Sequence, residues 1–115
     1  VYGLTPVYTL FIFLRQVLMQ ERNYQAKLIK LLQREFPGIV ILKNDSGYRQ
    51  GIPDLTLLYE DRWAALEVKK HSSSSVRPNQ EYYISKLNSM SFAAFISPDN
   101  EADILNELQI ALQPS

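Results

Sequence analysis

The sequence predicts an α/β fold, with a mixed sheet of about four strands flanked by helices. Short apolar runs alternate with longer segments of helical periodicity, in the order helix, three strands, helix, strand, helix. Three consecutive strands form an antiparallel meander, and a strand that returns through a helix can pair in parallel. The chain has 115 residues and no internal repeat, which is enough for one domain with its own core.

The first predicted helix runs from Glu21 to Phe36 and stops at Pro37-Gly38. Its apolar side chains fall near a 3.6-residue spacing and comprise Tyr24, Leu28, Leu31, Leu32 and Phe36. We expect this stripe to face the core.

Residues 1–18 differ in composition, and we expect them to form a hydrophobic extension ahead of a single domain at 19–115. Val7 to Leu14 is an apolar run that is too short to span a bilayer. It lacks the basic flank and the cleavage site of a signal peptide. Two interpretations stay open. The extension is an arm that packs on the domain or on a second subunit, or it is a leader outside the native protein, with Met19 as the initiation point.

Three strands are predicted in the middle of the chain. Ile39 to Leu42 reads as a buried strand and Asn44 to Gly51 as a loop. Leu55 to Tyr59 and Trp63 to Val68 are two further strands, joined by a tight turn at Glu60-Asp61. Both faces of these two strands are largely apolar, which indicates a covered position inside the sheet.

Two helices and one strand are predicted in the last third. Pro78 to Met90 is a helix, with Pro78 suited to its first turn; Ser91 to Ile96 is a strand, and Glu101 to Leu112 is the last helix. The side chains expected to be available for burial are Tyr82, Ile84, Leu87 and Met90 in the first helix, and Ile104, Leu105, Leu108 and Leu112 in the second.

The two-residue turn fixes the hairpin register and brings three charged residues together. Asp54 faces Glu67 on one side of the sheet. Lys69 lies on that side too, because it is two residues beyond Glu67. Opposed carboxylates repel unless a cation neutralises them, and an adjacent ammonium suits a reaction centre that carries negative charge. The trio therefore predicts a metal site for phosphodiester cleavage.

Each member of the trio also has an ordinary explanation when taken singly. Asp54 could simply start a strand, and Glu67 and Lys69 could form an exposed ion pair of little energetic value. The combination is much rarer, and a charge among mostly apolar strand positions is costly without a purpose.

Composition narrows the choice of metal. The chain has no cysteine and one histidine, which excludes disulfides, thiolate zinc sites and multi-histidine sites. Oxygen ligands favour Mg²⁺, with Mn²⁺ as a substitute. The absence of cysteine fits a reducing cytoplasm. Net charge is zero, but residues 87–115 contain four acidic and no basic residues, so the chain has one acidic end and a basic body.

Pro53-Asp54 followed by Glu67-Val68-Lys69 resembles the motif of the PD-(D/E)XK nuclease superfamily. The stretch from Gly47 to Gln80 is most similar to its virus-type replication-repair nuclease (VRR-NUC) branch and to the related phage and archaeal Holliday-junction resolvases. The resemblance covers about residues 20–112 and implies a restriction-endonuclease-like core. Together with the small size, it suggests a phage or mobile-element origin.

The resemblance implies roles for the motif residues. Asp54 and Glu67 would bind magnesium, with the carbonyl of Val68 completing the protein ligands. Lys69 would orient or activate the attacking water, or stabilise charge on the phosphate.

The resemblance also extends to flanking residues. Glu21 matches a glutamate near the start of the family's first helix, and Gln80 matches a glutamine on the helix after the motif. A favourable first-turn acid and an exposed glutamine are the plainer explanations. The loop from Lys43 to Gly51 would face DNA, and His71 is expected to be a loop residue. Phosphate contacts are expected from Lys43, Arg49, Lys70 and Arg77.

The leading hypothesis is a magnesium-dependent endodeoxyribonuclease, selective for branched DNA in its favoured version. Symmetric cutting of two strands predicts a homodimer. We expect no membrane association and no small-molecule cofactor, and RNA stays open as a substrate. Two other hypotheses stay open: a non-catalytic nucleic-acid-binding module on the same fold, and a small α/β interaction domain in which the trio is an ion-pair cluster.

Overall fold

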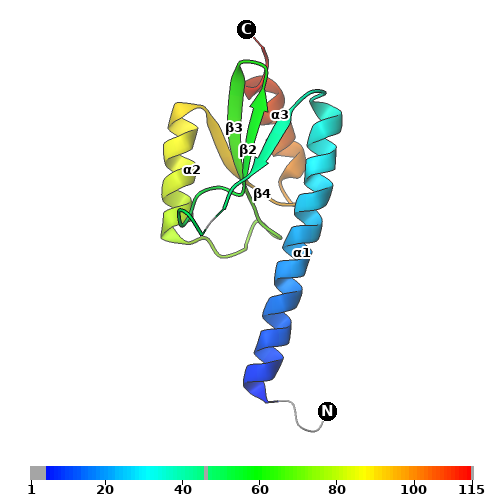
Figure 1. Cartoon of the computed structure of the whole chain (residues 1–115), viewed down its shortest axis with the longest axis vertical. Coiled ribbons are helices and arrows are strands. Elements are labelled where there is room, and N and C mark those ends of the chain that lie inside the picture. Colours follow the sequence, from blue (N-terminus) through cyan, green and yellow to red (C-terminus); the bar gives the residue numbers. More distant parts are fainter. Residues whose placement is uncertain (1–4, 46, 115) are drawn as a thin grey trace.

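The computed structural model of the chain describes residues 5–45 and 47–114. Within these residues it has three helices and a four-stranded mixed sheet, in the order helix, three strands, helix, strand, helix (Figure 1). The predicted fold class is confirmed. Residues 1–4 of the predicted extension and Ser46 of the predicted loop lie outside the described residues.

The strands lie in the sheet in chain order. β1 (Val40–Lys43), β2 (Leu55–Tyr59) and β3 (Arg62–Val68) form the antiparallel meander, and β4 (Phe92–Ile96) pairs in parallel with β3. The crossover between β3 and β4 contains α2 (Pro78–Met90). Each strand differs by at most one residue at either end from its prediction.

The β2–β3 hairpin has the predicted register, with Thr56 paired to Ala65 and Leu55 to Leu66. Glu60, the first residue of the turn, has a φ of 57°, a positive value of the kind that two-residue hairpin turns require. Side chains alternate along a strand, so Leu55 points into the core and its neighbour Asp54 to the other face.

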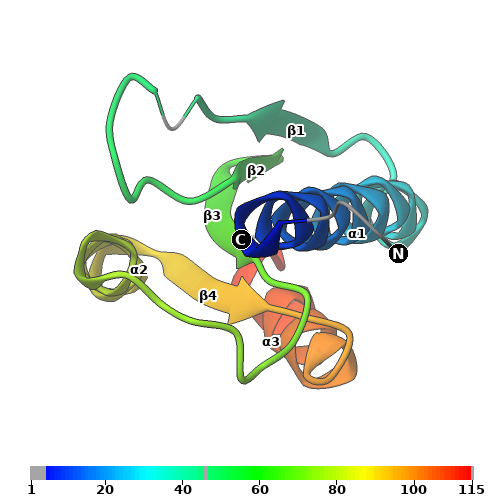
Figure 2. The ribbon, with the colours of Figure 1, turned by 90° about the horizontal axis from the view of Figure 1, so that it is seen from below.

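The core lies on one face of the sheet, under α1 (Pro6–Glu35) and α3 (Glu101–Ala111), and α2 lies on the opposite face (Figure 2). The largest fully buried apolar side chains include Leu28, Leu32, Leu55, Leu57, Leu66, Ile96, Leu108 and Leu112. The predicted inner stripes of the first and last helices are therefore confirmed at these positions.

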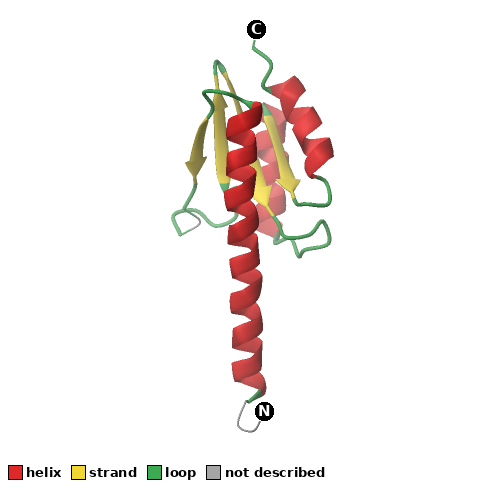
Figure 3. Ribbon diagram, turned by 90° about the vertical axis from the view of Figure 1, so that its right-hand side faces the viewer, coloured by secondary structure: helices red, strands yellow, loops and turns green. Residues whose placement is uncertain are grey.

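The predicted start of the first helix at Glu21 is wrong, because α1 begins at Pro6 and continues without a break (Figure 3). Thr5 Oγ1 accepts a hydrogen bond from the Tyr8 N–H at 3.1 Å, which caps the helix, and Pro6 takes the first helical position. No glycine or proline interrupts residues 7–35. The change in composition near residue 18 therefore does not mark a structural boundary.

The first half of α1 projects beyond the sheet (Figure 1). Its large apolar side chains are not covered by the rest of the described chain, and those more than half exposed are Val7, Tyr8, Leu10, Phe11, Phe13, Leu14 and Leu18. Among the described residues, no helix has the length and hydropathy needed to cross a membrane.

Two predictions of burial are wrong. β1 is an edge strand rather than a buried one, because β2 is its only neighbour among the strands of residues 5–45 and 47–114, and Val40 and Leu42 are about half exposed. α2 has no buried residue, and Tyr82 and Met90 are 60% and 64% exposed. This helix lies against a sheet face with small side chains such as Ala65 and Ala93. Only a narrow strip of the helix surface is needed to cover side chains of this size.

Gly51 lies where the β1–β2 loop meets the first turn of α2. Its φ is +86°, and a Cβ there would lie 2.5 Å from the Asn79 Cβ. We expect Gly51→Ala to lower the free energy of unfolding by roughly 2–5 kcal/mol, because backbone strain and a steric clash add. Urea denaturation followed by circular dichroism measures the loss.

Gly38→Ala is the matched control for that substitution. Gly38 has a φ of +91° but no atom within 4 Å of its Cβ position, so only the backbone cost applies, about 1–2 kcal/mol. Equal losses in the two variants would contradict tight packing of the loop on α2.

Candidate metal centre

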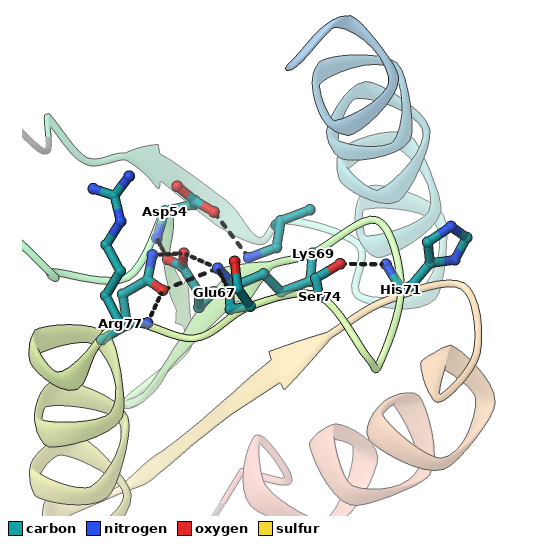
Figure 4. A network of polar contacts seen from close by, with 9 residues as sticks. Asp54, Glu67, Lys69, His71, Ser74 and Arg77 are labelled. Carbon is teal, nitrogen blue, oxygen red and sulfur yellow. Dashed lines mark hydrogen bonds and ion pairs between the residues drawn. The ribbon is translucent and has the colours of Figure 1, made fainter. Parts of the chain in front are cut away.

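Asp54 and Glu67 lie side by side where β2 begins and β3 ends (Figure 4). The Asp54 N–H donates to Glu67 Oε1 at 3.2 Å, and the Val68 N–H donates to Asp54 Oδ2 at 2.9 Å. Each carboxylate is therefore held by the backbone of the opposite strand, as the hairpin register predicts. Glu67 is 5% exposed, so one of the two charges is almost fully removed from water.

Asn44 fixes the backbone around Asp54 from the other neighbouring strand. Its N–H donates to the Asp54 carbonyl at 2.8 Å, and its Nδ2 donates to the Pro53 carbonyl and to Thr56 Oγ1, both at 2.9 Å. Sequence reasoning missed this role and assigned Asn44 to a loop. The β1–β2 register, which pairs Leu42 with Thr56, could have revealed it, because the same register sets Asn44 opposite Asp54.

Lys69 and Gln80 complete the cluster. Lys69 Nζ lies 3.7 Å from Glu67 Oε2 and donates to Gln80 Oε1 at 2.9 Å and to the Ser75 carbonyl at 3.1 Å. Gln80 Nε2 donates to Glu67 Oε2 at 2.7 Å. The glutamine thus bridges the buried acid and the lysine with its two different ends, and it is not the exposed helical glutamine of the plainer explanation.

The position of Gln80 is set by the start of α2. Its Oε1 also accepts from the Arg77 N–H at 3.1 Å, one of the backbone donors that a helix start leaves without an intrahelical partner. Pro78 occupies the first turn of the helix, as predicted. The hydrogen bond from the Arg77 N–H therefore holds the Gln80 side chain at the first turn of α2, beside the site.

Burial raises the pKa of both carboxyls. For Glu67 the pKa rises to about 7, chiefly through desolvation and then through repulsion by Asp54, against the opposing attraction of Lys69. For Asp54 desolvation also raises the pKa, and the hydrogen bond from the Val68 N–H opposes it. Strongly perturbed pKa values concentrate at functional sites, because such sites hold charge where water cannot screen it.

The Val68 backbone is oriented toward the same site. The Lys69 N–H donates to the Ile96 carbonyl across the β3–β4 pair, so the preceding residue directs its N–H and C=O the other way. The Val68 N–H indeed reaches Asp54. Its carbonyl oxygen thus lies on the side where the resemblance implies a third protein ligand.

The donor set fits a hard divalent cation. Within the described residues, no group of three or more histidine, cysteine, aspartate or glutamate side chains could hold a metal ion. A cation bound here would therefore take oxygen atoms from Asp54 and Glu67 and fill its shell from backbone and water, as magnesium does in proteins. Such a charge would stabilise the ionised form of both carboxyls.

Glu21 is not brought into this cluster. It is half-buried on α1, and among the described residues it makes no hydrogen bond or ion pair with Asp54, Glu67 or Lys69. Its role stays a prediction that rests on the resemblance alone.

The four residues predicted to contact phosphates lie on different segments of the chain. Arg77 is the N-cap residue that precedes α2, and Lys70 follows Lys69 and is half-buried. Lys43 is the last residue of β1 and Arg49 lies on the β1–β2 loop, and both are exposed. His71 is an exposed loop residue, as predicted, and Figure 4 shows its imidazole pointing away from the carboxylates.

Comparison with known proteins adds no assignment. No protein-family model, curated protein or solved structure matches the chain. The geometry of the site is therefore the basis for a functional proposal.

The raised pKa of Glu67 predicts a pH-dependent stability. Because the folded-state pKa lies above the unfolded value of 4.5, the native state binds this proton more tightly, and stability falls as pH rises from about 4.5 through 7. Without divalent cations, we expect Glu67→Gln to raise the free energy of unfolding by roughly 1–3 kcal/mol at pH 8 and by much less at pH 5. Urea titrations at pH 5 and pH 8 measure the free energy of unfolding of the two chains.

The exposed Glu107 on α3 provides the control, because Glu107→Gln removes a carboxylate that stays in water. We expect little change from it at either pH. A gain from Glu67→Gln that is the same at pH 5 and pH 8 would contradict the desolvated state of this carboxyl.

Proposed function

We propose that the protein is a magnesium-dependent endodeoxyribonuclease of the PD-(D/E)XK type. The observation that carries the proposal is the convergence of Asp54, Glu67 and Lys69 at the end of one hairpin, with both carboxyls at raised pKa. The Pro53-Asp54 and Glu67-Val68-Lys69 motifs and the order of helices and strands support it.

The contacts at the site suggest a separate role for each residue in this proposal. Asp54, Glu67 and the Val68 carbonyl would hold the cation, which supplies Lewis acidity toward a phosphate oxygen. Lys69 has three N–H donors, and Gln80 and Ser75 accept two of them. The remaining donor can orient a water molecule or a phosphate oxygen, and its positive charge stabilises negative charge that develops during hydrolysis.

The substrate in this proposal is DNA, with branched DNA as the favoured form and RNA as the other nucleic acid to test. Lys43, Arg49, Lys70 and Arg77 would contact phosphates on the face that carries α2. We propose that the enzyme acts in the cytoplasm, where DNA is accessible and where a chain without cysteine is at no disadvantage.

A non-catalytic nucleic-acid-binding module is the second candidate. It is favoured by the small number of acidic ligands, since the described residues contain no third acidic or histidine side chain close enough to hold a metal with Asp54 and Glu67. The presence of Lys69 in the same cluster favours catalysis instead.

Cleavage of a DNA panel in the presence of magnesium tests the proposal. The panel comprises linear duplex, single strand, flap and four-way junction, with EDTA as the metal-free arm. We expect Asp54→Asn and Lys69→Ala to lower the rate by at least about 10²-fold, because they remove a metal ligand and a transition-state charge. Product formation on denaturing gels measures the rate.

Asp103→Asn and Lys30→Ala are matched controls on exposed helix positions, and both are expected to cleave like the unsubstituted chain. Absence of cleavage with magnesium and manganese, combined with salt-sensitive DNA binding, would favour the binding module.

Symmetric cutting of a junction requires two sites, so we also propose a homodimer. The uncovered apolar side chains of α1 provide a candidate contact. We expect the full chain to sediment as a dimer and a double substitution, Phe11→Ser with Leu14→Ser, to shift it toward monomer. Analytical ultracentrifugation measures the change.

A chain that begins at Met19 is the informative comparison for that experiment. If it is as dimeric as the full chain, the first half of α1 does not form the interface. A monomeric full chain would remove the homodimer from the proposal.

A further inference from the structure

Exposed aromatic and cationic side chains gather on two elements beside the candidate metal centre. Tyr48, on the β1–β2 loop, is 85% exposed, and Tyr82, on α2, is 60% exposed. Arg49 on the loop and Arg77, the N-cap residue of α2, are also exposed. None of the proposed catalytic steps uses the tyrosines.

The loop that carries Tyr48 is anchored directly at the site. The hydrogen bond from the Asn44 N–H to the Asp54 carbonyl, 2.8 Å long, closes the base of this loop at a proposed metal ligand. Gly51 lies in close contact with Asn79, the residue before Gln80. The Asn44 hydrogen bond and the Gly51 contact therefore hold the loop in place relative to the site.

A second link joins the loop to the tyrosines of α2. Arg49 Nη1 donates to Tyr83 Oη at 3.3 Å, and the rings of Tyr82 and Tyr83 pack edge to face with centroids 5.1 Å apart. Arg49, Tyr83 and Tyr82 therefore form a continuous row of contacts from the loop to α2.

Charge directs a polyanion to this face. The acidic residues of α3, which include Glu101, Asp103 and Glu107, lie on the other side of the sheet from α2 (Figure 2). A nucleic acid is repelled there and attracted by Arg49 and Arg77 on the α2 side, where Lys86 offsets Glu81 of the same helix.

We propose that residues 47–51 and α2 form a platform for a single-stranded stretch of DNA next to the metal centre, with Tyr48 stacking on an unpaired base. Its place in catalysis rests on the proposed nuclease function. A duplex hides the faces of its bases within the stack, whereas an unpaired base offers its face to an exposed ring, and arginines hold the phosphates on either side. The substrate class is then DNA with an unpaired segment at the cleavage position.

Binding without cleavage tests the platform. Labelled oligo(dT) and a blunt duplex of equal length are titrated with the Asp54→Asn chain in EDTA, and fluorescence anisotropy gives the affinities. We expect Tyr48→Ala to weaken oligo(dT) binding about tenfold and duplex binding less than about twofold, and Tyr48→Phe to retain both. Arg49→Ala should reduce the salt dependence of binding by about one phosphate contact.

Tyr8→Ala, which removes an exposed tyrosine on the distant half of α1, is the matched control. Tyr48 is exposed enough that its variants are expected to fold normally, which circular dichroism verifies. Equal weakening for both DNAs, no weakening, or the same loss in Tyr48→Phe as in Tyr48→Ala would each overturn the platform.

The two proposals fail separately. Magnesium-dependent cleavage without a Tyr48 effect on oligo(dT) binding overturns the platform and supports the nuclease. Oligo(dT) binding that depends on Tyr48, without cleavage of any DNA, supports the platform and overturns the nuclease.

Discussion

Two carboxylates that face each other across a hairpin, one of them almost fully buried, are the constraint to which the rest of the site responds. Desolvation and mutual repulsion raise the pKa of Glu67 to about 7, a cost that the fold bears at neutral pH. The neighbouring groups reduce that cost: Lys69 supplies the opposite charge, Gln80 donates to Glu67, and the Val68 N–H donates to Asp54. In the proposed enzyme, a bound divalent cation would reduce the remaining repulsion between the two carboxylates.

Several segments meet at the end of the sheet that carries this pair. Asn44, which follows β1, holds the backbone at Pro53 and Asp54, and the β1–β2 loop packs on α2 through Gly51. The start of α2 in turn presents Gln80. The core on the opposite face, under α1 and α3, is apolar and supplies the rigid support on which this polar end is built.

Much of this arrangement could be predicted from sequence, because the strongest signals are local. A two-residue turn leaves one register for the hairpin, and that register alone brings Asp54 to Glu67. The start of α1 was missed because a change in composition was taken for a boundary, although the Thr5-Pro6 cap signal was present. Gln80 was indicated only by the resemblance, because its place at the site depends on how α2 lies relative to the hairpin. The role of Asn44 requires the β1–β2 register, which the long connection between these two strands does not fix.

The hydrogen bonds that Gln80 makes to Glu67 and Lys69 bear on how the protein folds without a metal ion. Among the described residues, every buried polar side-chain atom has a hydrogen-bond partner, so the site is already complete as a network. Domains whose fold is created by metal binding collapse when the ion is withdrawn. In the proposed enzyme, folding and activation would therefore be separable: the polypeptide would reach its native shape first, and the supply of divalent ions would control its activity rather than its fold.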